Sequence, residues 1–243
     1  MDQIESVVQR EVALAAGLAP SQRQRLLELT AEFVGAKQWE GTNGLTPTPD
    51  MRIVVAANAV IPVLSFDLWP YENVRSVILR PGVAVTRSLR SGPTGGTYHD
   101  STAHVIGEAT PRSGPVALTW PAVLRDSRHP RTGRNVVIHE FAHKIDMRDG
   151  DADGLPPLRG EALDRWVTLL DEAFDGHADE SDEVLDAYAW ESPAEYFAVA
   201  TETYFCTPLK LAAMKPALYD VLCDLYQQDP AGIRGTGEAT TPA

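Results

Sequence analysis

The alternation of apolar and polar residues divides the chain into two helical ends and a middle third of short strands. Apolar residues recur at helical spacing over residues 3–17 and 20–35, which predicts two helices. The longer apolar run MRIVVAANAVIPVL predicts a buried helix that Asp50 could cap and that ends near Pro62. The N-terminal part, residues 1–65, is therefore expected to be helical.

The middle third contains β-branched segments separated by Gly, Pro and Ser clusters, which is typical of strands joined by turns. The expected strands are SVILRP, VAVTRSL, AHVIGEAT and PVALTW. The glycine-rich stretch between Arg90 and Thr102 predicts a mobile loop. If the last strand, Val116 to Trp120, is the exposed edge of the sheet, an extended peptide could pair with its free N–H and C=O groups.

The C-terminal third predicts helices again. One helix is expected from about Gly160 to Phe174, and a last one over residues 216–228. Between them, Ser192 followed by Pro193 and Glu195 marks the start of another helix.

These elements together predict an α+β fold. We expect a single domain over residues 1–228, with a core from residue 74, and a disordered tail over residues 229–243.

The stretch VVIHEFAHKID, Val136 to Asp146, carries the candidate chemistry. His139 and His143 are four residues apart and so share one face of a helix. Two imidazoles on one face can hold a zinc ion, and the carboxylate of Glu140 can reach a water bound to it. Buried polar groups cost free energy unless they find partners. The apolar neighbours of these residues therefore favour a metal site over an ordinary surface helix.

Composition narrows the class of protein. The formal net charge of −13 over 243 residues argues against direct binding to nucleic acid. The acidic, polar start is not typical of a signal peptide, and no apolar run reaches the length of a membrane span, so we expect a cytoplasmic protein. Cys206 and Cys223 lack metal-site spacing and are expected to be reduced, packed thiols.

A peptidase zinc site needs three protein ligands and an open position for water. The candidates for the third ligand are His177, Glu191, Glu195 and Glu202. His177 lies in a polar turn and is expected at the surface. Glu195 and Glu202 are seven residues apart on one helix face, so one could bind the ion while the other orients a ligand histidine. From the residues alone, a capping-box role for Glu195 is nearly as well supported.

A family resemblance adds to this picture. The stretches SGPVALTW, NVVIHEFAHKIDMRDG, DAYAWESPAEYFAV and YQQDP resemble the Mlc titration factor family of bacterial zinc-dependent peptidases, whose catalytic core is similar to that of anthrax lethal factor. The resemblance runs from about the second helix to Gln228. It implies a zincin-like (gluzincin) core with a small mixed sheet against the zinc helix, one Zn²⁺ per chain, and hydrolysis of peptides as an aminopeptidase or an endopeptidase.

The resemblance also implies roles for individual residues. His139 and His143 match the family's ligands and Glu140 its catalytic carboxylate, while Glu195 matches the third ligand. Tyr188 matches a tyrosine that faces the active site in the lethal-factor comparison, where it would donate a hydrogen bond to the developing oxyanion.

Two further carboxylates are candidates for supporting roles. With Glu195 as the ligand, Glu202 becomes the candidate to orient a ligand histidine, against a plain buried pair. Asp146 could hydrogen-bond within the site or cap the helix end. The stretch TYFCTP after Glu202 departs from the family's aromatic-rich pattern without touching the ligand set.

The sequence therefore favours a zinc peptidase acting on a peptide or protein. Members of the resembled family are named for binding the repressor Mlc, so a transcriptional repressor of that type is an expected partner. Two alternatives stay open: a protein that sequesters a regulator with little proteolysis, and a zinc site that is purely structural or absent. Neither direct nucleic-acid binding nor a membrane is expected.

Overall fold

The computed structural model describes most of the chain. The described residues are 2–82, 84–91, 98–105, 107–109, 114–148, 150, 152–175 and 182–232, with side chains described outside residues 84–109. The statements below concern these residues.

Helices dominate the described chain. The α-helices are α1 (Asp2–Glu11), α2 (Pro20–Ala36), α3 (Pro49–Val60), α4 (Trp120–Arg128), α5 (Val136–Asp146), α6 (Glu161–Asp175), α7 (Pro193–Cys206), α8 (Pro208–Met214) and α9 (Pro216–Tyr226). Single 3₁₀ turns are η1 (Ala13–Gly17), η2 (Ile61–Val63), η3 (Trp69–Tyr71), η4 (Pro130–Thr132) and η5 (Ala187–Glu191).

The main sheet is small and mixed. Its strands are β1 (Gln38–Gly41), β2 (Ser76–Arg80), β6 (Val116–Thr119) and β5 (Gly107–Ala109), in the spatial order β1-β2-β6-β5. The first three run parallel, and β5 pairs antiparallel with β6. The fold is therefore α+β, as the sequence predicts.

The edge of this sheet differs from the sequence-based expectation. β6 hydrogen-bonds to β2 on one side and to β5 on the other, so it is an interior strand, and β5 is the outer one. The segment containing β5 was expected to be a strand, but its position in the sheet depends on long-range pairing that strand propensity does not encode.

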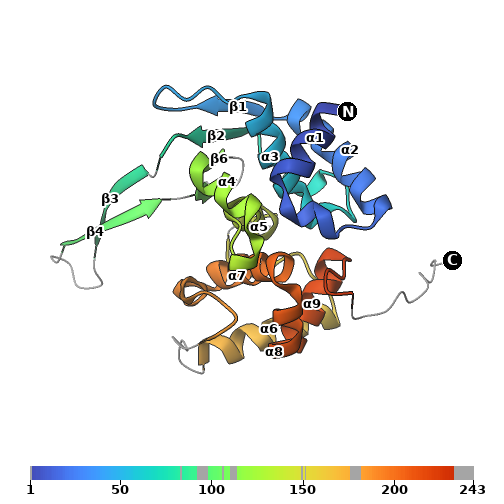
Figure 1. Cartoon of the computed structure of the whole chain (residues 1–243). Helices are drawn as coiled ribbons and strands as arrows, with labels where there is room; N and C mark the ends of the chain where they lie inside the picture. The colour runs from blue at the N-terminus through green and yellow to red at the C-terminus, as the bar shows by residue number, and fades with distance from the viewer. Residues whose placement is uncertain are drawn as a thin grey trace.

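A second, two-stranded antiparallel sheet joins β3 (Ala84–Ser91) to β4 (Tyr98–Val105) and extends away from the body of the molecule (Figure 1). The predicted loop between Arg90 and Thr102 is wrong at its ends, because Ser91 and Tyr98 pair across this sheet. Residues 92–97 lie outside the described chain.

Helix α5 occupies the centre of the fold (Figure 1). It packs on α3, β5 and β6 on one side and on α7 on the other. The ring of Phe141, on α5, makes edge-to-face contacts with Phe33 (5.5 Å between centroids) and Tyr71 (4.8 Å), which anchor α5 to the N-terminal helices. α5 therefore lies where the N-terminal and C-terminal halves of the chain meet.

Several helix ends follow local sequence signals, and a few do not. The predicted first helix is α1 followed by the 3₁₀ turn η1. The N-cap of α3 is Thr48, whose hydroxyl accepts a hydrogen bond from Met51 N at 3.3 Å, so the predicted cap at Asp50 is wrong. Asp50 instead lies in the first turn, where a carboxylate is also favourable.

The chain directly after residue 228 is not disordered, as the sequence predicted it to be. Asp229 accepts a hydrogen bond from the Tyr219 hydroxyl at 2.6 Å, and Ala231 N donates to the same hydroxyl at 2.9 Å. The ordered chain thus continues past residue 228, and residues 233–243 lie outside the described part.

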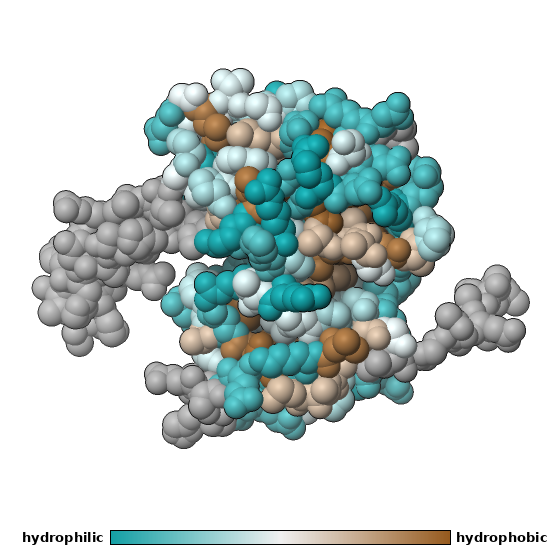
Figure 2. All heavy atoms as spheres, viewed as in Figure 1, coloured by the Kyte–Doolittle hydropathy of each residue, from teal (hydrophilic) through white to brown (hydrophobic). Residues whose placement is uncertain are grey.

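The viewed surface is mostly hydrophilic, with hydrophobic residues in small separate areas (Figure 2). Among the described helices, none is both long enough and apolar enough to cross a membrane. Cys206 and Cys223 are buried, and the Tyr204 hydroxyl donates a hydrogen bond to Cys223 Sγ at 3.4 Å.

Candidate metal centre

Helix α5 presents its polar residues toward α7. Asn135 caps the helix, since its side chain accepts a hydrogen bond from Ile138 N at 3.2 Å. Val137 and Phe141 are fully buried on the opposite, apolar side. The helical period then directs His139 and His143 to the same side, and their rings contact each other with centroids 4.8 Å apart.

Helix α7 supplies the facing carboxylate. Ser192 caps α7 by accepting from Glu195 N at 3.2 Å, and Pro193 occupies the first turn. Glu195 Oε2 lies 3.1 Å from His139 Nε2 and 3.3 Å from His143 Nε2. The side chain of Glu195 therefore faces the two histidines, while only its main chain takes part in the cap.

The three donor atoms have the spacing of a tetrahedral metal site. The two Nε2 atoms are 3.2 Å apart, which completes a triangle with sides of 3.1, 3.2 and 3.3 Å. Ligand atoms about 2.0–2.1 Å from a zinc ion at tetrahedral angles would lie about 3.3–3.4 Å from one another. Within the described chain, His139, His143 and Glu195 form the one cluster of this kind. Two imidazoles and one carboxylate are also the donor set that suits zinc.

The charges around the cluster favour a bound cation. Burial alone would raise the pKa of Glu195, but the adjacent rings of His139 and His143 outweigh it and lower the pKa to about 2. Burial alone would lower the pKa of His139, whereas Glu202, Glu195 and Glu140 raise it well above its usual value. The site thus concentrates negative charge around the His139 ring, which holds a proton in the absence of a metal ion.

Glu202 lies behind His139. Its Oε1 is 2.7 Å from His139 Nδ1, and its Oε2 accepts a hydrogen bond from the main-chain N–H of Asn135 at 2.5 Å. When Nδ1 donates to this carboxylate, the lone pair of Nε2 points to the triangle of donors. The two carboxylates of α7 thus have different contacts. Glu195 faces both histidines, and Glu202 contacts the Nδ1 atom of His139.

Asp146, at the end of α5, is fully buried and contacts the loop that follows. Its Oδ2 accepts a hydrogen bond from Gly154 N at 2.9 Å. The residue that caps the C-terminus of α5 is Met147. Asp146 therefore ties the end of α5 to the loop that packs against the start of α7, at Pro193.

Tyr188 lies beside the cluster on the turn η5. Asp186 caps this turn by accepting from Tyr188 N at 3.0 Å, and Arg134 forms an ion pair with Asp186. The Tyr188 ring is 6.0 Å from the His139 ring, and 44% of the residue is exposed. Burial of the hydroxyl and the nearby Glu195 raise its pKa to about 12, so the phenol stays protonated at neutral pH.

Glu140 follows His139 on α5. It is 5% exposed, and its charge acts on His139, Tyr188 and Lys144. The structure therefore brings Glu195, Glu202 and Tyr188 to the two histidines of α5, whereas Asp146 contacts the loop at Gly154. His177, the histidine considered as an alternative ligand, lies outside the described residues.

Sequence reasoning missed Lys144 and Asn58. Lys144 is fully buried and donates to the carbonyl of Gly114 at 3.1 Å, just before β6, and burial lowers its pKa to about 8. Asn58, fully buried in α3, accepts a hydrogen bond from Asn135 Nδ2 at 2.8 Å. For Asn58 the available signal was one amide inside a long apolar run, whereas Lys144 stands among other polar residues of α5 and carries no such signal.

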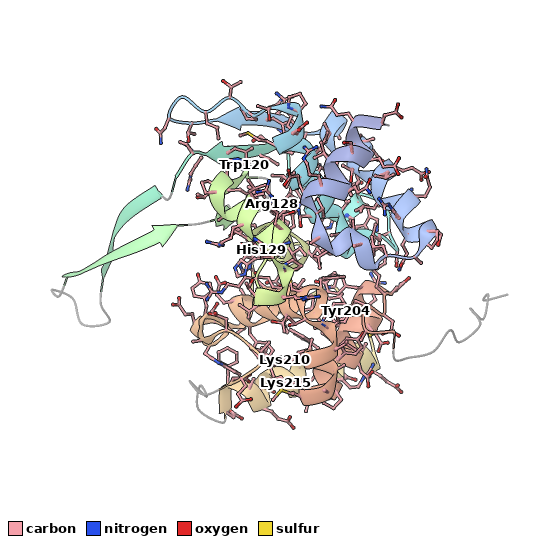
Figure 3. The ribbon with its side chains drawn as sticks, viewed as in Figure 1. Trp120, Arg128, His129, Tyr204, Lys210 and Lys215 are labelled. Carbon is pink, nitrogen blue, oxygen red and sulfur yellow. The ribbon has the colours of Figure 1, made fainter. Side chains whose placement is uncertain are left out.

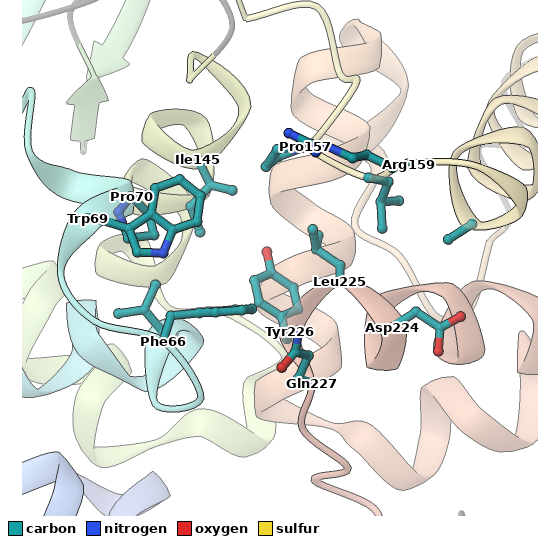
Figure 4. Close-up of a pocket in the computed structure, with 13 residues that line it drawn as sticks. Phe66, Trp69, Pro70, Ile145, Pro157, Arg159, Asp224, Leu225, Tyr226 and Gln227 are labelled. Carbon is teal, nitrogen blue, oxygen red and sulfur yellow. The ribbon is translucent and has the colours of Figure 1, made fainter. Parts of the chain in front are cut away.

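A separate cavity of about 310 Å³ lies on another side of α5 (Figure 4). Ile145 of α5 lines it together with Trp69 and Tyr226, whereas none of the three donor residues does. This cavity is therefore distinct from the candidate metal centre.

A buried helix carrying two histidines and a glutamate, with a carboxylate from a second helix, is the arrangement found in metallopeptidases. Residues 1–227 match the family model described as glucose-regulated metallo-peptidase M90, and the chain belongs to that family.

Relatives span most of the chain. The Mlc titration factor A of Klebsiella pneumoniae is 33% identical over 226 residues, covering 90% of this chain and 84% of the relative. The Mlc titration factor A of Yersinia pestis is 32% identical, covering 90% and 82%. An uncharacterized protein of Synechocystis is 30% identical over 220 residues, covering 88% and 80%.

Proposed function

We propose that this protein is a zinc-dependent peptidase with a zincin-like (gluzincin) core. The observation that carries the proposal is the triangle of His139 Nε2, His143 Nε2 and Glu195 Oε2, whose sides of 3.1 to 3.3 Å suit one tetrahedral ion. Membership of a metallopeptidase family supports the same conclusion.

His139, His143 and Glu195 would hold the ion, and a catalytic site of three protein ligands keeps a fourth position for water. A zinc ion bound to these residues would supply positive charge for the scissile carbonyl and would lower the pKa of a bound water to about 7. Glu140 takes the proton of the attacking water and delivers it to the leaving amine. Tyr188 donates a hydrogen bond to the oxygen that becomes negative, which its raised pKa of about 12 allows at neutral pH.

Strand β5 is the proposed support for the substrate. It is one of the two outer strands of the described main sheet, and it packs on α5. An extended peptide could add to this edge through main-chain hydrogen bonds, which would bring a peptide bond toward the donors on α5. Lys144 would stabilise this region, because it holds the Gly114 carbonyl at the start of β6.

The test combines zinc content with cleavage of a peptide library. We expect about one zinc per chain and cleavage by the wild type. In Glu140→Gln, cleavage should fall by about 10²–10⁴-fold, the usual contribution of general acid–base catalysis, while zinc is retained. Equal cleavage by both proteins would assign the activity to a contaminant. Absence of zinc after metal-replete expression would overturn the proposal. The positions of the cut bonds decide between aminopeptidase and endopeptidase.

A second candidate function is binding of a transcriptional repressor of the Mlc type. The names of the Klebsiella and Yersinia relatives favour it, and the net charge of −13 suits a basic partner. The test compares repression in the presence of the wild type and of Glu140→Gln. An equal effect of the two proteins would support sequestration over proteolysis.

A further inference from the structure

The orientation of His139 depends on a hydrogen-bond chain that reaches the N-terminal helices. Both oxygens of Glu202 are engaged: Oε1 by His139 Nδ1 at 2.7 Å and Oε2 by Asn135 N at 2.5 Å. A shift of the Asn135 main chain would therefore move the carboxylate that holds the ring.

Asn135 is itself held by its side chain, which is buried at the start of α5. Its Oδ1 accepts from Ile138 N at 3.2 Å, and its Nδ2 donates to Asn58 Oδ1 at 2.8 Å. One amide thus caps the helix that carries both histidines and attaches that cap to α3.

Asn58 uses its whole amide group. Besides accepting from Asn135, its Nδ2 donates to Val54 O at 2.8 Å and to Ser127 Oγ at 2.8 Å. Ser127 donates in turn to the main-chain oxygen of Glu11 at 2.6 Å. Near the surface, Arg128 at the end of α4 (Figure 3) pairs with the Glu11 carboxylate at 2.5 Å. The amide of Asn58 therefore has a single favourable orientation.

The location of Asn58 makes a space-filling role a poor explanation. It is 0% exposed among apolar residues of α3, where a hydrophobic side chain would avoid the cost of burying an amide. Hydrogen bonds are directional, so the amide of Asn58 fixes the position of the Asn135 side chain, which an apolar side chain could not do.

We propose that Asn58 is a positioning residue for the metal centre: through Asn135 and Glu202 it fixes the ring of His139 for the ion. The inference rests on the proposed zinc site and extends it to a residue of the N-terminal helical part.

The test measures the zinc dissociation constant by competition with a chelator. Partners of ligand histidines typically contribute about 10–100-fold to metal affinity, and Asn58 acts two steps further out, so Asn58→Ala should weaken zinc binding by about 3–10-fold. The matched control is Val55→Ala, which removes fully buried atoms from the same helix without touching the chain of hydrogen bonds. It should lose stability but keep the wild-type dissociation constant within about twofold. The Co²⁺-loaded proteins provide a second readout, since ligand geometry sets the visible absorption bands, which should shift in Asn58→Ala alone.

A double-mutant cycle tests the route. If Asn58 acts through Asn135, Asn58→Ala should weaken zinc binding far less in an Asn135→Ala background, so the two effects should not add. If Asn58→Ala does not fold, Ser127→Ala removes one acceptor of the Asn58 amide and should weaken binding in the same direction. Wild-type affinity in the folded variant, a loss equal to that of Val55→Ala, or additive effects would each overturn the inference. Failure of the wild type to bind zinc would instead overturn the proposed function.

Discussion

Gly154 lies against Pro193 so closely that a Cβ atom at position 154 would be 2.4 Å from the Pro193 carbonyl oxygen. Gly154 also has a φ of +79°, a conformation that residues with a Cβ rarely adopt. Its N–H donates to Asp146, and its carbonyl accepts from Trp166 Nε1 at 2.7 Å. This glycine therefore joins the end of α5 to the start of α7, two residues before Glu195.

Replacing Gly154 with alanine should weaken both the fold and the metal site. The left-handed backbone alone costs about 1–3 kcal/mol, and the new methyl group would push Pro193 and the first turn of α7 away. We expect a lower melting temperature and weaker zinc binding. Gly160→Ala is the control, because Gly160 has a φ of +55° but open space around its Cβ position. Zinc binding that falls equally in both variants would contradict a role for the Pro193 contact.

Removing the hydroxyl of Tyr188 should affect the reaction more than the fold. Loss of one hydrogen-bond donor to an oxyanion lowers kcat by about 10²–10³-fold, so Tyr188→Phe should show such a decrease with KM and zinc content nearly unchanged. Because the pKa of Tyr188 is raised to about 12, the wild type should keep this contribution up to about pH 11. Steady-state kinetics over that range would check both points, and an unchanged kcat would leave Tyr188 a structural residue.

The buried amine of Lys144 should make stability depend on pH. Burial lowers its pKa from 10.5 to about 8 in the folded protein, so between these pH values the unfolded chain binds more protons. The free energy of unfolding should then rise with pH across this window for the wild type relative to Lys144→Met. Urea unfolding of the zinc-free proteins at pH 7 to 10 measures the difference. Lys210→Met, at an exposed position, should show no such trend relative to the wild type.

Zinc binding should strengthen as pH rises. Against the effect of burial, Glu202 and Glu195 raise the pKa of His139, so the metal must displace a proton from this ring. In the zinc-free protein the same proton stabilises the fold fully below the ordinary histidine pKa, and this contribution is lost as pH rises through the raised pKa.

Titration calorimetry in buffers of different ionisation enthalpy would detect the released proton. Glu202→Gln should move the pH dependence of zinc binding to lower pH, because it removes a charge that raises the pKa of His139. A pH-independent affinity would contradict the displacement of a proton.

Local sequence signals account for much of the site. The spacing of His139, Glu140 and His143 dictates a shared helix face, and Ser192 with Pro193 marks where α7 begins. These features could be predicted because they depend on a few neighbouring residues. By contrast, the sequence could pose an exposed edge at β6 only as a condition, which is not met, since the pairing of β5 with β6 depends on how the sheet is assembled.

By itself the sequence determined which residues can bind a metal and that they lie on two helices. Only the tertiary structure shows where the two carboxylates of α7 lie relative to the histidines. The packing of α7 on α5 turns Glu195 toward both Nε2 atoms and brings Glu202 to the Nδ1 of His139, because two residues seven apart face different heights of the same neighbouring helix. The buried amide of Asn58 came from yet another helix, since hydrogen bonds between distant segments are set by packing and leave no local pattern.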